Sequence, residues 1–419
     1  MKKTICIFED EEFNNLLPLV YTRPVYDLRC GILTVRDKIA RYFNNSKIIL
    51  HTRRYLNDAV KEREPKYIIN HLSNENILFI NGRLLINKNI VSQLNKLKVN
   101  SIMYSITGSV AAANISADNV SNLLHPDNDF LQFNGLKELS KIECGVDLIK
   151  YPWDLVNANG SEIENDFDLL LKKTPPINLK KYPGVQFKNK KNIFLSKDVI
   201  IDPFVFIDAS NGSVYIGKNA HIMSHSFIQG SVFIGEESII KSHAAIYHNT
   251  SIGELCKVGG EVEASIIHSY SNKQHEGFLG HSYLGCWVNI GASTNTSDLK
   301  NNYGNISVLL NGKPVETNSK FVGLVMGDHS KTAINTMFNT GTIAGVSCNI
   351  FGAGFPARYI PSFSWGGSDF LKTYDINKCI DVARIVMRRR KVELSAAEEN
   401  LIRAIFELTA HERSLKVKS

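Results

Sequence analysis

The sequence predicts an alternating α/β domain, then a parallel β-helix, and finally a group of helices. Three observations support this division. Short apolar runs separated by helix-like patterns fill positions 1–175. Aliphatic residues then recur at intervals of six, a period that neither a helix nor an ordinary strand produces. After Pro361 the apolar residues return to helical spacing.

The first domain is predicted from four short apolar runs and one amphipathic pattern. The apolar runs are typical of buried strands, and they cover Thr4–Phe8, Lys47–His51, Ile77–Asn81 and Ser101–Ile106. Between the first two lies Gly31–Phe43, whose apolar residues have helical spacing. This alternation of strands and helices favours a sheet with helices packed on its faces.

Domain boundaries follow from changes of composition. Thr174-Pro175-Pro176 interrupts the α/β pattern, and a basic stretch that contains proline and glycine continues to Asn192. We therefore expect four segments: a first domain at 1–175, a linker at 176–192, a β-helix at 193–355 and a helical region at 356–419. The final helices are expected to cap the end of the β-helix.

The β-helix is predicted from eight aliphatic residues spaced six apart. They are Ile216, Ile222, Ile228, Ile234, Ile240, Ile246, Ile252 and Val258. A mostly small residue follows four positions after each, as Ala220, Ser226 and Ala244 illustrate. A short strand plus a tight corner accounts for six residues, so the aliphatic side chains should point inward. Two segments, 259–277 and 295–320, break the rhythm, and such excursions often carry binding loops.

Composition excludes several classes of function. A net charge of +7 on 419 residues is too small to indicate nucleic-acid binding, although it suits anionic small molecules such as sugar phosphates. The basic run Arg388–Lys391 is interpreted as a solvated helix face. Seven cysteines without C-x-x-C spacing indicate reduced thiols and a cytoplasmic location. No apolar stretch is long enough to cross a bilayer, so no membrane association is expected.

One segment of the β-helix region carries a family resemblance. Residues 275–291 have the sequence HEGFLGHSYLGCWVNIG, and Ala292 follows. The spacing of the first histidine, the two Leu-Gly pairs and Val288–Ala292 resembles the acetyltransferase segment of bifunctional N-acetylglucosamine-1-phosphate uridyltransferase/glucosamine-1-phosphate acetyltransferases. The resemblance implies a left-handed β-helix, acetyl-CoA as acyl donor, and a homotrimer with active sites between subunits.

The same resemblance implies roles for individual residues. His275 stands at the position of the catalytic base, and Asn289 stands at a position that contacts the sugar. Phe278 replaces a tyrosine that contacts the sugar phosphate. Ala292 stands where the acetyl-CoA site is lined, and Asn335 is assigned to the same coenzyme site.

The chemistry of acyl transfer agrees with these roles. An amine must lose its proton before it attacks a thioester, and an imidazole is a suitable base near neutral pH. An amide such as that of Asn289 can orient the acceptor or the developing oxyanion. Ser293 replaces a family glycine, and Glu263 lies near the place of a phosphate-binding lysine. These departures indicate an acceptor other than glucosamine 1-phosphate.

The first domain resembles a sugar nucleotidyltransferase of Rossmann-like fold, and most closely a divergent branch in which that domain is fused to an acetyltransferase-like β-helix. Asn14–Ile39 carries the resemblance. The glycine-rich phosphate loop of the family is missing, because Glu9–Asn15 is acidic and lacks glycine. The family's metal-binding aspartate is replaced by Arg83 in Asn81-Gly82-Arg83, and an arginine cannot ligate Mg²⁺.

Several functions remain consistent with the sequence. The favoured one is acetyl-CoA-dependent N-acetylation of an amino-sugar phosphate. Nucleotidyl transfer from a nucleoside triphosphate with Mg²⁺ is considered as an additional activity of the first domain, with Arg23, Arg29 and Arg83 as candidate phosphate ligands. Arg83 and the missing glycine loop predict that this activity is weak or absent. One alternative is a regulatory protein that binds a sugar nucleotide without turnover. Another is a metal-dependent hydratase of the β-helix carbonic anhydrase type, suggested by the closely spaced pairs His243 and His248, and His221 and His225, although no metal site is assigned.

Overall fold

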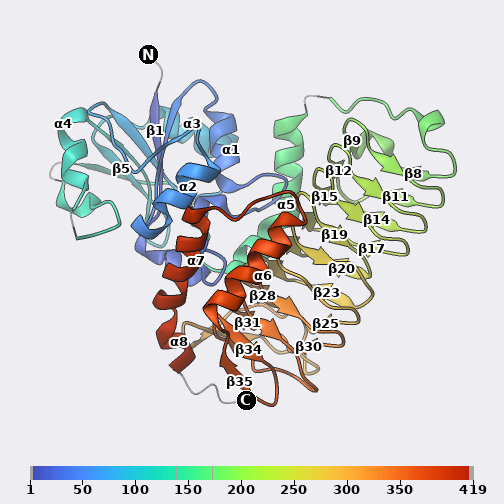
Figure 1. Ribbon diagram of the computed structural model, residues 1–419. Coiled ribbons are helices and arrows are strands. Elements are labelled where there is room, and N and C mark those ends of the chain that lie inside the picture. The colour runs from blue at the N-terminus through green and yellow to red at the C-terminus, as the bar shows by residue number, and fades with distance from the viewer. Residues whose placement is uncertain (1–2, 126, 137–138, 172, 415–419) are drawn as a thin grey trace.

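A seven-stranded mixed sheet forms the centre of the first domain (Figure 1). The computed structural model describes residues 3–125, 127–136, 139–171 and 173–414. In sheet order β3-β2-β1-β4-β6-β5-β7, the strands are Ile68–Ile69, Lys47–His51, Thr4–Phe8, Ile77–Asn81, Val110–Ile115, Ser101–Tyr104 and Ser140–Glu143. β1 pairs in parallel with β2 and β4, whereas β6 runs antiparallel to β4 and β5. Three of the four predicted strands have the predicted bounds, and β5 ends two residues earlier, at Tyr104.

Short helices connect these strands. They are α1 (Val35–Tyr42), α2 (Asn57–Arg63), α3 (Lys88–Lys96) and α4 (Ala117–Val120). α1 begins four residues later than the pattern Gly31–Phe43 predicts. Gly31 has a φ of +87°, which is incompatible with a helix, and the Thr34 hydroxyl accepts a hydrogen bond from the Asp37 amide at 3.2 Å as the N-cap.

The second half of the chain is a parallel β-helix, as predicted. Ile216, Ile234 and Ile252 stand in parallel register on successive strands of one face, so each coil contains three sides of the six-residue repeat. All eight aliphatic residues of this repeat are fully buried. The predicted inward orientation of these side chains is therefore confirmed.

Each of the three faces of the β-helix is a ladder of very short strands. The first face contains β8 (Gln186–Lys188), β11 (Phe206–Asp208), β14 (Phe227–Gln229), β17 (Ala245–Ile246), β20 (Glu261–Glu263) and β23 (Phe278–Gly280), and β25 (Asn295–Thr296) and β30 (Met337–Phe338) follow. The second face contains β9 (Ile193–Leu195), β12 (Val214–Ile216), β15 (Val232–Ile234), β18 (Thr250–Ile252), β21 (Ile266–Ile267), β24 (Tyr283–Leu284), β28 (Leu324–Met326), β31 (Thr342–Ala344) and β33 (Tyr359–Ile360). The third face contains β10 (Ile200–Ile201), β13 (His221–Ile222), β16 (Ile239–Ile240), β19 (Lys257–Val258), β22 (Asn272–Lys273), β29 (Lys331–Thr332), β32 (Asn349–Ile350), β34 (Ser364–Gly366) and β35 (Leu371–Thr373). Parallel strands therefore occur both within residues 176–192 and beyond residue 355.

The corners of the β-helix use left-handed backbone conformations. The φ angle lies between 55° and 62° at Asn219, His225, Glu237, His243 and Asn249. Side chains other than glycine seldom adopt this conformation, so the stacking of coils must hold each corner in place. The small residue of the repeat comes directly after each of these corners and is buried.

The two breaks in the rhythm have different structural outcomes. Ser251 pairs with Ile266, and Lys257 pairs with Asn272, so the coil at the first break is shorter than the regular ones. At the second break the chain leaves the coil, forms the antiparallel hairpin β26 (Ser307–Leu310) and β27 (Lys313–Glu316), and returns at β28.

The C-terminal helices do not cap the β-helix, contrary to the prediction. α6 (Ile376–Arg388) and α7 (Ala396–Leu408) lie along its side, next to the first domain, and α8 (Ala410–Ser414) follows (Figure 1). Arg63 at the end of α2 makes a bidentate ion pair with Glu398 of α7, at 2.5 and 2.7 Å. The apolar stripe of α7 enters a hydrophobic cluster shared by the first domain and the second face, which explains why these helices lie there.

The first domain and the β-helix share one hydrophobic core. Val25 of the first domain and Tyr283 of the second face belong to the same buried cluster. Helix α5 (Pro152–Leu170) packs against β15, β18 and β24. Lys38 of α1 is buried and forms ion pairs with Glu162 and Asp166 of α5. The two halves are therefore joined along a continuous interface.

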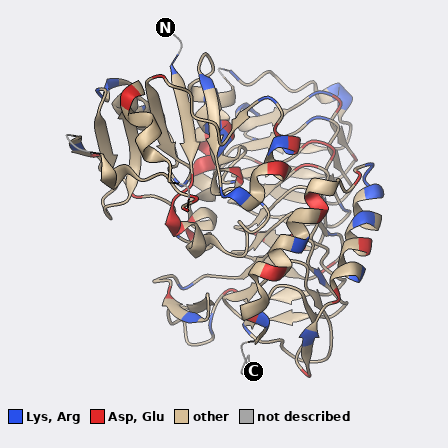
Figure 2. Cartoon of the chain, turned by 60° about the vertical axis from the view of Figure 1, so that its left-hand side comes forward, with Lys and Arg blue, Asp and Glu red and all other residues tan. Residues whose placement is uncertain are grey.

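Two surface properties bear on the classes of partner. Lys and Arg are interspersed with Asp and Glu over the chain (Figure 2), unlike the single basic face that characterises nucleic-acid-binding proteins. In the part of the chain that the structure describes, no helix combines the length and the apolar character needed to span a bilayer.

Candidate active site

The residues predicted for acyl transfer lie along one edge of the β-helix, where the third face turns into the first. His275 lies in the turn between β22 and β23. Ala292 occupies the equivalent turn of the next coil, and its carbonyl accepts a hydrogen bond from the Asn335 amide at 2.8 Å. The Ser293 hydroxyl donates to the Glu276 carboxylate at 2.6 Å. His275, Ala292 and Asn335 thus follow one another on three adjacent coils.

The other two predicted residues lie on either side of this edge. Asn289 lies on the third face, where it forms parallel bridges with Asn272 and with Lys331. Its side-chain oxygen accepts a hydrogen bond from the Asn272 amide at 3.4 Å. Phe278 lies on the first face, and its backbone amide donates to the Asn295 side chain at 2.8 Å. The structure therefore brings the predicted acceptor and coenzyme residues to one edge.

His275 itself is exposed, and its turn is held from inside the coil. Its imidazole has no hydrogen-bond partner among the described residues. The buried Lys273 ammonium donates to the His275 carbonyl at 3.0 Å and to the Gly259 carbonyl at 2.8 Å. Burial lowers the pKa of Lys273 to about 8. The backbone of His275 is therefore held in place, whereas its imidazole is accessible to a substrate or to a second protein surface that would enclose it.

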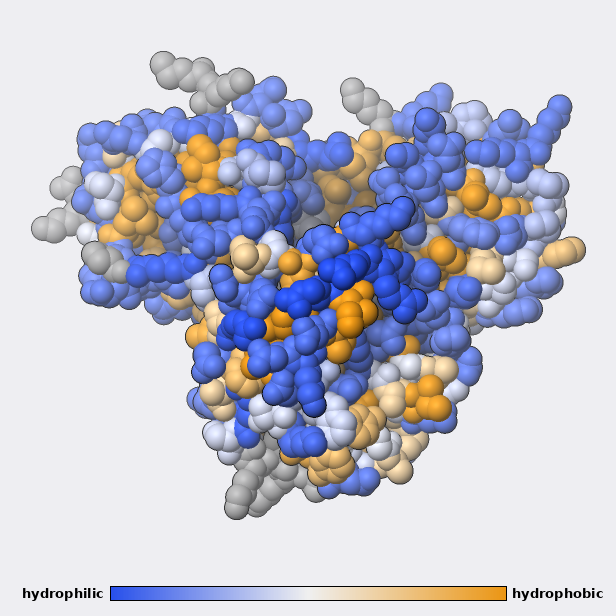
Figure 3. Space-filling view, viewed as in Figure 1, coloured by the Kyte–Doolittle hydropathy of each residue, from blue (hydrophilic) through white to orange (hydrophobic). Residues whose placement is uncertain are grey.

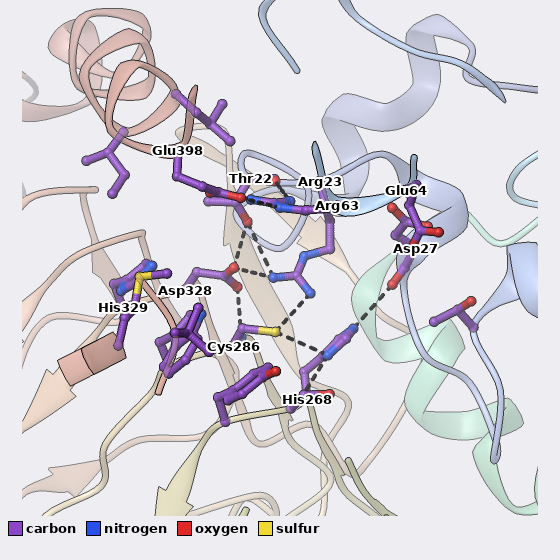
Figure 4. Close-up of a pocket in the computed structure, with 18 of the residues that line it drawn as sticks. Thr22, Arg23, Asp27, Arg63, Glu64, His268, Cys286, Asp328, His329 and Glu398 are labelled. Atoms are coloured by element: carbon purple, nitrogen blue, oxygen red, sulfur yellow. Dashed lines mark hydrogen bonds and ion pairs between the residues drawn. The ribbon is translucent and has the colours of Figure 1, made fainter. Parts of the chain in front are cut away.

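A separate cavity of about 420 Å³, here called the junction pocket, lies where the first domain, the β-helix and α7 meet (Figure 4). Thr22 and Arg23 reach Asp328 from the first domain, and Arg63 reaches Glu398. The charged groups at its centre are therefore already paired with opposite charges. Such pairs favour a structural role for these arginines more than an open anion site.

The junction pocket also contains a thiol and imidazole pair that the sequence analysis missed. Cys286 Sγ lies 3.2 Å from His268 Nδ1 and 3.3 Å from Arg23 Nη1. His268 Nε2 lies 3.2 Å from the Asp27 carbonyl, which assigns the ring hydrogen to Nε2 and leaves Nδ1 as an acceptor. Burial raises the pKa of the Cys286 thiol to about 11, against the charge of Arg23. The two residues are separated in sequence by the length of one regular coil, and this spacing could have revealed them.

The three candidate phosphate ligands of the first domain are all engaged in ion pairs. Arg23 pairs with Asp328, and Arg29 makes two contacts of 2.8 Å with Glu254. Arg83 donates to Asp10 at 2.6 and 2.9 Å. Phosphate binding by these arginines would require exchange of their carboxylate partners.

The Arg83–Asp10 pair lies at the carboxyl ends of β1 and β4, where open α/β sheets bind their ligands. Next to it, the fully buried Glu9 pairs with Arg53 at 3.0 Å. Both oxygens of Asp10 contact the Arg83 guanidinium, so this carboxylate is not available to a cation. The donor set at this position does not fit Mg²⁺.

The histidines considered for a metal site are dispersed. The His243 ring stacks on His225, with 5.0 Å between centroids, whereas His248 lies 3.3 Å from Glu263. His221 interacts with Asp202 at 3.0 Å. Over the described ranges, no group of three or more His, Cys, Asp and Glu residues is arranged to hold a metal ion.

Comparison with protein families finds a match for the first domain. Residues 5–174 match the family model described as sugar nucleotidyl transferase. The first domain is thus similar to sugar nucleotidyl transferases, and in this chain it is joined to a β-helix.

Two bifunctional proteins are among the relatives of this chain. The bifunctional protein GlmU of Methanocaldococcus jannaschii is 35% identical over 88 residues, which are 21% of each chain. A bifunctional sugar-1-phosphate nucleotidylyltransferase/acetyltransferase of Sulfurisphaera tokodaii is 33% identical over 142 residues, 33% of this chain and 35% of that protein. The chain therefore spans far less than two thirds of the length of these relatives.

Solved structures of acyltransferases align only loosely. The Arabidopsis UDP-N-acetylglucosamine acyltransferase has 14% identity and a TM-score of 0.22, with 56% of this chain and 85% of that chain covered. The Caulobacter crescentus GDP-perosamine N-acetyl transferase, solved with CoA and GDP-perosamine, has 14% identity and a TM-score of 0.16, with 42% and 58% covered. TM-scores of this size establish neither a shared fold nor a shared function.

Proposed function

We propose that the chain is a cytoplasmic acetyl-CoA-dependent N-acetyltransferase that acts on an amino-sugar phosphate. The observation that carries the proposal is the stacking of His275, Ala292 and Asn335 on adjacent coils, with Asn289 and Phe278 on either side. His275 accepts the proton of the acceptor amine as its nitrogen attacks the thioester carbonyl. The carbon–sulfur bond then breaks, and the departing thiolate of CoA takes up a proton.

We propose further that the enzyme is a homotrimer in which a neighbouring subunit covers the edge that carries His275. Large apolar side chains are exposed along this edge in a single chain, including Phe204 at 68%, Ile334 at 67% and Met337 at 39%. A second copy would remove these side chains from water and enclose the imidazole, which a single chain leaves open.

A thiol-release assay tests the proposed reaction. The full chain is mixed with acetyl-CoA and a panel of amino-sugar phosphates, and free thiol is measured together with the N-acetylated product. We expect thiol release that depends on the acceptor and equals product formation. If no amino-sugar phosphate or nucleotide-linked amino sugar stimulates thiol release, the proposal is wrong.

For the first domain we infer weak or no Mg²⁺-dependent nucleotidyl transfer. The Arg83–Asp10 and Arg53–Glu9 pairs support this inference, because they fill the end of the sheet where phosphates and Mg²⁺ would be held. Pyrophosphate release from each nucleoside triphosphate, with Mg²⁺ and several sugar 1-phosphates, should stay at background. A turnover near about 10 s⁻¹, a usual enzyme value, would contradict the inference.

A further inference from the structure

A second cavity, of about 340 Å³, lies between the third face and the end of α6. Four basic residues line it: Lys257 and Lys331 from the third face, and Arg389 and Arg390 from the segment directly after α6. We call it the cationic pocket. Strongly hydrophilic side chains also gather on the surface over α6 and α7 (Figure 3). Of the described residues that line this cavity, none is acidic.

The positive charges of the cationic pocket lack counter-charges. Lys257 and Arg389 make no ion pair and no side-chain hydrogen bond within the described part of the chain. Arg390 donates to the neutral Asn272 side chain at 2.7 Å, and Lys331 donates to the His329 carbonyl at 2.8 Å. This arrangement differs from the junction pocket, where arginines face carboxylates.

Like charges gathered around one cavity repel one another unless an anion lies between them. Burial lowers the pKa of Lys257, and the neighbouring charges of Arg390, Lys241 and Arg389 lower it further. A bound polyanion would remove the repulsion between these charges. The run Arg388–Lys391 is therefore more than the solvated helix face that the sequence predicts, because two of its arginines turn toward the third face.

We propose that the cationic pocket binds the diphosphate group of a nucleotide-linked ligand. Guanidinium groups bind phosphate oxygens in a bidentate manner, and four cations exceed what a single phosphate of about two negative charges requires. The remaining lining suits a nucleotide. Tyr270 and Trp287 form a stacked pair with 4.1 Å between ring centroids, and Asn272, Gln274 and Asn289 supply amide groups.

The cationic pocket adjoins the candidate active site. Gln274 and Asn289 line the pocket, and Gln274 directly precedes His275. On the other side of His275, β20 of the first face carries Glu261 and Glu263. An anionic acceptor would therefore approach His275 from the third face. This last step rests on the proposed acetyltransferase activity, whereas diphosphate binding does not.

The test is calorimetric titration of the full chain, without acetyl-CoA, using inorganic phosphate, pyrophosphate and UDP as probes. We expect pyrophosphate and UDP to bind at least about tenfold more tightly than phosphate. The double variant Arg389→Gln/Arg390→Gln should weaken pyrophosphate binding about 100-fold, or roughly tenfold for each charge-assisted contact that is lost.

Arg388→Gln is the matched control, since it removes the same charge from the same run. Arg388 pairs with Glu393 at 3.3 Å and does not line the pocket, so its replacement should change the affinity by less than about twofold. Arg390 also contacts Asn272, so the double variant could misfold. Lys257→Gln keeps the test valid in that case, because it removes no ion pair and no side-chain hydrogen bond of the described chain. We expect about tenfold weaker binding for Lys257→Gln.

Three outcomes would overturn the proposal: equal affinities for phosphate and pyrophosphate, no saturable pyrophosphate binding, or the same loss in Arg388→Gln as in the pocket variants. Because the titration contains no acyl donor, normal pyrophosphate binding in a chain without thiol release would refute only the acetyltransferase activity. Thiol release that persists without any pyrophosphate binding would refute only the diphosphate site.

Discussion

Replacement of His275 by alanine is expected to lower the rate of acceptor-dependent thiol release by roughly 100-fold to 10,000-fold, the usual contribution of a general base. The imidazole is exposed and has no hydrogen-bond partner in the described chain, so its removal should leave the fold intact. The Michaelis constant for acetyl-CoA should change little, because His275 addresses the amine while Ala292 and Asn335 lie on the following coils.

His243→Ala is the matched control for this experiment. His243 lies on the same edge of the β-helix, is exposed, and stacks on His225. It should keep the full rate. Full thiol release by His275→Ala would contradict its assignment as the base. If the activity of the chain is instead lost on addition of a chelator, and also in His243→Ala and His248→Ala, the metal-dependent hydratase becomes the better assignment.

Replacement of Ile234 by aspartate is expected to unfold the chain. Ile234 is fully buried and lies in register between Ile216 and Ile252. Burial of an unpaired carboxylate costs several kcal/mol, which is comparable to the total stability of roughly 5–15 kcal/mol of a typical domain. Circular dichroism should show loss of the strand signal, and the protein should be recovered as aggregate.

Ile200→Asp controls for the chemistry of the substitution. Ile200 is also an aliphatic strand residue of the β-helix, but its side chain points outward and is 55% exposed. Its replacement should change the free energy of unfolding by less than about 0.5 kcal/mol. Equal destabilisation by both substitutions would contradict the assignment of inward and outward positions.

The fold could be predicted in detail wherever one physical cause dominated. A six-residue spacing of aliphatic residues is typical of a β-helix, so the burial of the eight repeat residues from Ile216 to Val258 could be predicted from the sequence. Each of β1, β2 and β4 is built around an uninterrupted apolar run, and the bounds predicted from these runs agree with the structure. The positions of α6 and α7 could not be predicted, because an amphipathic stripe specifies that a surface is covered but not which surface.

The candidate site was predicted in part, for a similar reason. His275, Ala292 and Asn335 come together because the repeat itself brings equivalent positions of adjacent coils into contact. The ion pairs of Arg23, Arg29 and Arg83 depend on contacts between distant segments, and no local pattern reveals such partners. The cationic pocket combines Lys257 with Arg389, which lie far apart in the sequence, so the basic run alone could not show its role.

The arginines that join the first domain to the β-helix and to α7 have a consequence for the synthesis of the chain. Arg23 pairs with Asp328, Arg29 with Glu254, and Arg63 with Glu398. Translation delivers all three arginines to the ribosome exit long before their carboxylates exist. The emerging first domain therefore carries unmatched cations beside apolar surface that the second face will later cover, a state that invites chaperone binding. The interface between the first domain, the β-helix and α7 can form only after α7 has been synthesised. The last helices of the chain therefore complete the packing of the domain that was synthesised first.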